Sequence, residues 1–142
     1  MPELLLKAVA LSDLVTIHQK AGIGRLSAYC GAISAGCGAG AGIAYLQGGK
    51  ADAVAHTVVN AIAILSGTIC DGAKPSCAAK IAAAVDAGIL GYAMFLEDQQ
   101  FYGGDGIVTK GVDNTVRNIG ILAREGMRQT DKTILEIMLQ TD

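Results

Sequence analysis

The sequence has 142 residues, a net charge of −2 and 51% hydrophobic residues, enough apolar material for the core of one compact domain. Acidic and basic residues are interspersed, so no basic stripe is available for a nucleic acid and we expect no such partner. The N-terminus lacks the charged region and apolar core of a secretory signal, which predicts a cytoplasmic protein.

Four helices are predicted in the first two thirds of the chain. The first covers residues 2–20, with a proline in its first turn and branched apolar residues at helical spacing. Two apolar segments rich in small residues, 26–46 and 51–69, are typical of buried helices. Ser76 is predicted to cap a fourth helix over residues 77–96, because a serine oxygen accepts a hydrogen bond from an unpaired N–H there.

The last third of the chain is more polar. Residues 97–111 contain charges, amides and several glycines and predict a long loop, either a lid or a disordered connection. Shorter helices are predicted over residues 112–124 and 130–139. No segment alternates apolar and polar residues as a strand does. We therefore expect an all-α fold, a compact bundle of five to six helices that forms a single domain over residues 1–142.

Small residues dominate the predicted central helices. The chain has 19 glycines, while aromatic residues make up only 4%. Each glycine inside a helix costs about 1 kcal/mol relative to alanine. The composition therefore predicts Gly/Ala-rich helices whose backbones approach each other closely enough to offset this cost.

The apolar central segments are also long enough to raise the question of a membrane protein. Polar and charged residues lie in the middle of these segments, namely His56 and Asn60 in one and Lys80 and Asp86 in another. Such residues are costly inside a bilayer. We expect buried helices of a soluble bundle and no membrane partner.

Four cysteines, Cys30, Cys37, Cys70 and Cys77, are the candidate functional residues. A cytoplasmic compartment argues against disulfides. Cys70 and Cys77 flank the polar turn "DGAKPS", which favours a chain reversal that lets their sulfurs converge. Cys30 and Cys37 are separated by about 10 Å of rise in an unbroken helix, so only one of them can join such a site, or the helix is interrupted.

The spacing leaves three uses for these thiols open. Free cysteines are often simply buried in a core, and this use is as probable from spacing as any metal site. Zinc is a weaker alternative, because the sequence has no C-x-x-C motif. A centre held by three cysteines would leave one coordination position open, as a Lewis-acid site requires.

The segments "GRLSAYCGAISAGCGAGAGIAYLQGG" and "SGTICDGAKPSCAAKIAAAVDAG" carry a resemblance. Together they resemble the C-terminal half of the serine dehydratase-like family, and specifically its L-cysteine desulfidase branch. The resemblance implies a [4Fe-4S] cluster whose ligands are Cys30, Cys70 and Cys77, with Cys37 as a packing residue. It also implies α,β-elimination of L-cysteine or L-serine, an amino-acid substrate, with the catalytic residues unknown.

Members of this family are longer than this chain. The resemblance therefore implies that the chain is the C-terminal, cluster-binding part of an enzyme whose N-terminal part is its partner. We expect the chain alone to be inactive, and the cluster to be lost in air. Homo-oligomers fit the small-residue helices. The rival function is a non-catalytic helical interaction module in which the thiols only pack.

Polar residues next to the cysteines have both structural and functional interpretations. Asp71 is expected to shape the turn rather than to act as an acid. Lys74 is expected to be solvated rather than to clamp a substrate. Beside a bound cluster, the nearest candidate hydrogen-bond donors are Ser76, Lys74 and the backbone of Gly72.

Two further candidates lie elsewhere in the sequence. His56 and Asn60 are four residues apart and share a helix face, where a buried, hydrogen-bonded pair is favoured over an acid-base role. Arg25 suits a substrate carboxylate, but solvation at a helix end explains it equally well.

Overall fold

The computed structural model describes residues 1–140. The regular structure of this part of the chain is helical, with one isolated β-bridge in addition. The helices are α1 (Pro2–Ile23), α2 (Gly31–Leu46), α3 (Ala51–Leu65), α4 (Ser76–Leu96), α5 (Val112–Ile121), the π-helical turn η1 (Leu122–Gly126) and α6 (Arg128–Leu139). The expected all-α bundle is confirmed.

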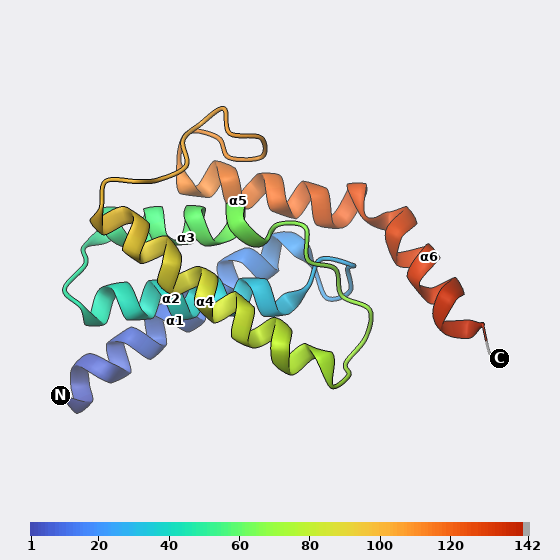
Figure 1. The fold of residues 1–142 in the computed structure, drawn as a ribbon, viewed down its shortest axis with the longest axis horizontal. Coiled ribbons are helices and arrows are strands. Elements are labelled where there is room, and N and C mark those ends of the chain that lie inside the picture. The colour runs from blue at the N-terminus through green and yellow to red at the C-terminus, as the bar shows by residue number, and fades with distance from the viewer. Residues whose placement is uncertain (141–142) are drawn as a thin grey trace.

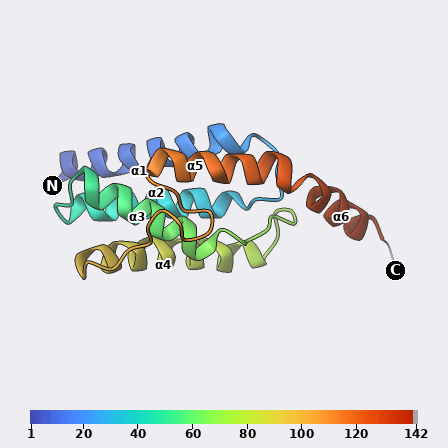
Figure 2. The same cartoon turned by 90° about the horizontal axis from the view of Figure 1, so that it is seen from above.

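The helices are arranged in three layers (Figures 1 and 2). Helices α1 and α5 form one outer layer, α2 and α3 form the middle layer, and α4 covers the opposite side. Helix α2 packs against α1, α3 and α4, so it is the central helix of the bundle. Helix α6 contacts η1 and extends away from the layers, and none of its residues is fully buried (Figure 1).

Small residues let α2 and α4 touch backbone to backbone, as the composition predicts. A Cβ atom on Gly40 would lie 2.7 Å from the Cα atom of Gly88. A Cβ atom on Gly36 would collide with the backbone carbonyl of Ala84. No side chain larger than hydrogen fits at these positions without separating the helices. The close contact places the N-termini of α2 and α4 at the same end of the bundle (Figure 2).

The expected helix over residues 26–46 is wrong in its first turn, because α2 begins only at Gly31. Residues 28–30 instead pair with residues 68–70, so the third helix ends at Leu65 rather than at residue 69. Backbone groups that pair with a distant segment are not available for helical hydrogen bonds. This interruption separates Cys30 from the helix that contains Cys37.

The predicted cap of α4 is also wrong. Ser76 is the first residue of α4 rather than its cap, the cap position is Pro75, and no side chain caps this end by a hydrogen bond. Pro75 has helical dihedral angles, φ −54° and ψ −35°, so the chain enters the helix through the proline itself.

One helix of the described residues, α4, is long and apolar enough to cross a membrane by length and composition alone. It carries Lys80 and Asp86 and packs against α2 and α3. Its apolar residues therefore serve, at least in part, as packing surface in the bundle.

Candidate functional site

Two short segments distant in sequence form an antiparallel pair that positions two of the cysteines. The N–H of Cys30 donates to the carbonyl oxygen of Thr68 at 3.2 Å, and the N–H of Cys70 donates to that of Ala28 at 2.6 Å. These two hydrogen bonds lie on either side of the antiparallel β-bridge between Tyr29 and Ile69. Because side chains alternate along extended chain, Cys30 and Cys70 lie on the same face of the pair as diagonal neighbours.

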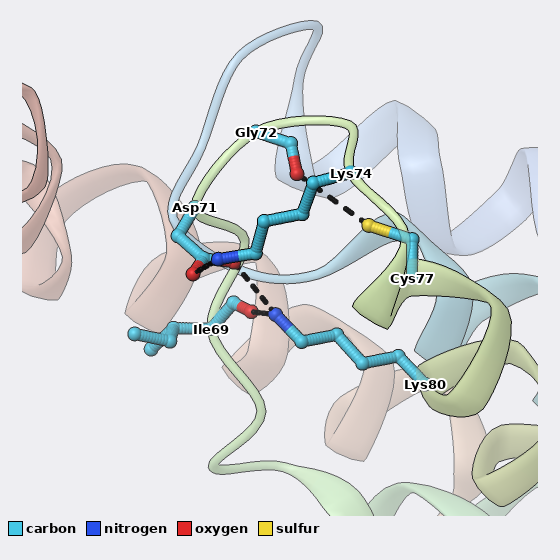
Figure 3. Close-up of polar contacts among 6 residues, drawn as sticks. All are labelled: Ile69, Asp71, Gly72, Lys74, Cys77 and Lys80. Atoms are coloured by element: carbon cyan, nitrogen blue, oxygen red, sulfur yellow. Dashed lines mark hydrogen bonds and ion pairs between the residues drawn. The ribbon is translucent and has the colours of Figure 1, made fainter. Parts of the chain in front are cut away.

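Cys77 approaches the same region from the first turn of α4. Its Sγ donates to the carbonyl oxygen of Gly72 at 3.4 Å across the turn that follows Cys70 (Figure 3). Gly72 has φ of 93°, which side chains larger than hydrogen rarely adopt. Cys70 and Cys77 are both half-buried. The turn thus keeps both thiols accessible at one end of the bundle.

Asp71 lies between two lysines in this turn (Figure 3). The ammonium of Lys74 donates to Oδ2, and the ammonium of Lys80 donates to Oδ1 at 2.7 Å. These hydrogen bonds, first that of Lys74 and then that of Lys80, lower the pKa of Asp71 to about 2. Asp71 is therefore ionised at neutral pH and shapes the turn through the charged hydrogen bonds of its side chain.

Lys80 is the group that connects the turn to α4. Its ammonium also donates to the carbonyl oxygen of Ile69 at 2.9 Å. The hydrogen bond to Asp71 is the main cause that raises the pKa of Lys80, and the nearby sulfurs of Cys30 and Cys77 add to it. Sequence reasoning missed this role, although a lone lysine one turn after Cys77 in an apolar helix was a signal for it.

Cys37 has different surroundings. It lies inside α2 with 1% of its surface exposed, and burial raises the pKa of its thiol to about 12, an effect that the amide of Gln19 partly opposes. The hydroxyl of Tyr29 is also buried, and its pKa is raised first by burial and then by Cys37 and Cys30. A neutral thiol fixed in the core is a packing group rather than an accessible ligand.

The three cysteines Cys30, Cys70 and Cys77 thus come from segments gathered at one end of the bundle. Within residues 1–140, no three His, Cys, Asp or Glu side chains are grouped closely enough to hold a single metal ion. The donor set is sulfur-rich, and the neighbouring lysines supply positive charge for thiolates. Cysteine thiolates are ligands of iron-sulfur clusters as well as of zinc, so the types of donor present are compatible with such a cluster.

The other polar candidates lie elsewhere. The buried amide of Asn60 donates from Nδ2 to the carbonyl oxygen of Gly91 at 2.9 Å, and its Oδ1 accepts from the N–H of Phe101 at 3.0 Å. His56 stacks on Phe95 with ring centroids 5.6 Å apart. Asn60 is buried and hydrogen-bonded as expected, and it anchors the 97–111 loop to α3 and α4. His56 is only half-buried and stacks on Phe95, so the expected buried, hydrogen-bonded pair is wrong for this residue.

The remaining candidates are the 97–111 loop, Arg25 and Ser76. The 97–111 loop is held by its own hydrogen bonds, among them Tyr102 N–H to Asp105 Oδ2 at 2.7 Å, and is a folded connection. Arg25 and Ser76 are both exposed, and Ser76 lies at the entrance of α4 beside the cysteine turn. A role of either side chain toward a substrate or cluster stays a prediction.

A groove of about 800 Å³ lies between α1, α3 and α5. Its walls are mainly apolar, with side chains such as Leu11, Leu14, Val54 and Val116, and none of the cysteines lines it. The groove offers no metal-binding sulfur and no group near the turn. The groove is therefore separate from the segments that carry the cysteines.

Comparisons with known proteins agree with the resemblance seen in the sequence. The family model described as "Serine dehydratase alpha chain" matches residues 1–136. Relatives include UPF0597 proteins of Desulfitobacterium hafniense, 67% identical over 137 residues, and of Lachnoclostridium phytofermentans, 52% identical over 137 residues. Each match covers 96% of this chain but only 32% and 33% of the relative, respectively. The chain thus spans about a third of the length of these relatives. No solved structure matches.

Proposed function

Since the chain belongs to the serine dehydratase alpha chain family, we propose that it is the cluster-binding part of an iron-sulfur lyase. The reaction is α,β-elimination, which converts L-cysteine and water to pyruvate, ammonia and sulfide, or L-serine to pyruvate and ammonia. The observation that carries the proposal is the pairing of residues 28–30 with residues 68–70, which puts Cys30 beside Cys70 at the turn that ends at Cys77.

We propose that Cys30, Cys70 and Cys77 hold a [4Fe-4S] cluster, with Cys37 outside the site. When bound, such a cluster supplies an iron with an open position, a Lewis acid for the carboxylate and the leaving group of the substrate. The chain's own residues supply the sulfur ligands, a turn that exposes two of them, and an excess of one positive charge from Lys74 and Lys80 against Asp71. This charge favours an anionic substrate carboxylate near the site.

The catalytic base and the substrate pocket are proposed to come largely from the rest of the enzyme, because the matched relatives are about three times the length covered here. Large apolar side chains on the surface of α1 support a further partner within the enzyme. Leu6, Leu14 and Ile17 are 69%, 64% and 61% exposed. Several exposed large apolar side chains on one helix favour an interface with another part of the enzyme. We propose a cytoplasmic enzyme in which this chain is the C-terminal part, alone inactive.

The test is anaerobic reconstitution with iron and sulfide, applied to this chain and to the longest polypeptide that carries it. We expect broad absorbance in the visible range from both, and pyruvate formation only from the longer polypeptide. Comparing kcat/KM for L-cysteine and L-serine identifies the substrate. If the longer polypeptide takes up no iron, the lyase proposal fails and the chain is a helical interaction module. If it takes up a cluster but forms no pyruvate from either amino acid, the proposed reaction is wrong.

A further inference from the structure

Lys80 connects the segment that carries Cys70 to the helix that carries Cys77. Its ammonium bonds to Ile69 and Asp71, the two residues on either side of Cys70, at 2.9 and 2.7 Å. It lies one helical turn after Cys77. We infer that Lys80 is a positioning residue of the cysteine site, which fixes Cys70 relative to Cys77 and places a positive charge near the proposed ligands. This inference rests on the proposed cluster.

The hydrogen bonds of Lys80 act as a brace between two elements. Ile69 belongs to the paired segment and Asp71 to the turn that follows it, whereas Lys80 belongs to α4. With the brace in place, the chain from Cys70 to Cys77 is held at both ends as well as by the Cys77 contact to Gly72 (Figure 3). Ligands fixed before binding lose less conformational entropy when they bind.

Lys80 and Lys74 differ in how exposed their side chains are and in which groups lie near their ammonium groups. The side chain of Lys80 is 22% exposed and its charge acts on the sulfurs of Cys30 and Cys77, whereas the side chain of Lys74 is 42% exposed on the turn. A less exposed charge is screened less by water and salt. Both lysines donate to the carboxylate of Asp71, so each substitution removes one positive charge that is paired with this carboxylate. The chain therefore contains its own matched control.

The experiment compares Lys80→Met, Lys74→Met and Lys80→Arg with the unmodified chain. In the iron-free protein, Lys80→Met is expected to speed amide hydrogen exchange in residues 69–77 more than Lys74→Met does, because only Lys80 also donates to the carbonyl oxygen of Ile69 and lies on α4. In the reconstituted protein, Lys80→Met is expected to lose iron to a chelator about tenfold faster, as is common for groups that orient metal ligands. Its cluster should have a lower reduction potential, because a positive charge that favours the reduced state is gone. Lys80→Arg should restore most of the potential.

Equal exchange, iron loss and potential in Lys80→Met and Lys74→Met would overturn the inference, while the proposed cluster would stand as long as iron uptake still depended on the cysteines. Failure of the unmodified longer polypeptide to take up iron would instead overturn the proposed function and this inference with it. Iron uptake by the unmodified longer polypeptide therefore distinguishes a failure of the inference from a failure of the proposed function.

Discussion

Replacing Cys30 by alanine is expected to abolish cluster formation, whereas replacing Cys37 by alanine should leave it intact. The two residues are a matched pair, because both are buried in the same core, at 5% and 1% exposure, and the same substitution removes one sulfur from each. Cys30 lies on the segment paired with Cys70, and Cys37 lies about two turns further inside α2. Iron and acid-labile sulfide per chain, measured after anaerobic reconstitution, are the readouts.

Cys70→Ser and Cys77→Ser are expected to match Cys30→Ala, with most of the iron lost. Thermal unfolding of the iron-free variants is the control, because Cys70 packs against the core and its replacement could also lower stability. If Cys37→Ala lost iron as fully as Cys30→Ala while all variants stayed folded, the assignment of the ligands would be wrong. Retention of iron by Cys70→Ser and Cys77→Ser together would exclude the turn from the site.

Gly36→Ala is expected to lower the free energy of unfolding by about 1–3 kcal/mol, even though alanine favours helix over glycine by about 1 kcal/mol. The added Cβ would collide with the backbone carbonyl of Ala84, which cannot rotate away. Helices α2 and α4 would have to separate, and their N-termini carry or adjoin Cys30 and Cys77. We therefore expect reduced iron uptake as well as reduced stability, measured by urea denaturation and iron content.

Gly22→Ala is the control for this prediction. Gly22 is also helical, but a Cβ there would meet only the Cα atom of Gly120 at 3.6 Å, an ordinary contact. The substitution should be neutral or stabilising by up to about 1 kcal/mol. Similar unfolding curves for the two variants would contradict the claim that close backbone contact between α2 and α4 accounts for the glycine content.

The sequence predicted the helices well where their patterns are local. Proline in the first turn and apolar spacing located α1, and the small residues at Gly36, Gly40 and Gly88 do form the expected close contact. The start of α2 was predicted several residues too early, because the backbone partners of Cys30 lie near Thr68. A pairing between such distant segments leaves no local signal in either of them.

The sequence indicated the turn that carries two of the candidate cysteines, but not the contacts that connect this turn to the rest of the bundle. The turn between Cys70 and Cys77 followed from its polar residues, and the helix rise separated Cys30 from Cys37. Lys80 appeared only as a charge in an apolar helix, because its partners Ile69 and Asp71 become neighbours through the reversal of the chain. The departure of α6 from the bundle likewise depends on η1, a π-helical turn without a predictable spacing pattern.

The most direct test of the account is Mössbauer spectroscopy of the longest polypeptide that carries this chain, reconstituted with isotopically enriched iron. Three cysteine ligands predict a cluster in which one iron differs from the others, and adding L-cysteine or L-serine should change the signal of that iron alone. Four equivalent irons, a single isolated iron, or a cluster whose spectrum ignores both amino acids would contradict a three-cysteine site with an open position.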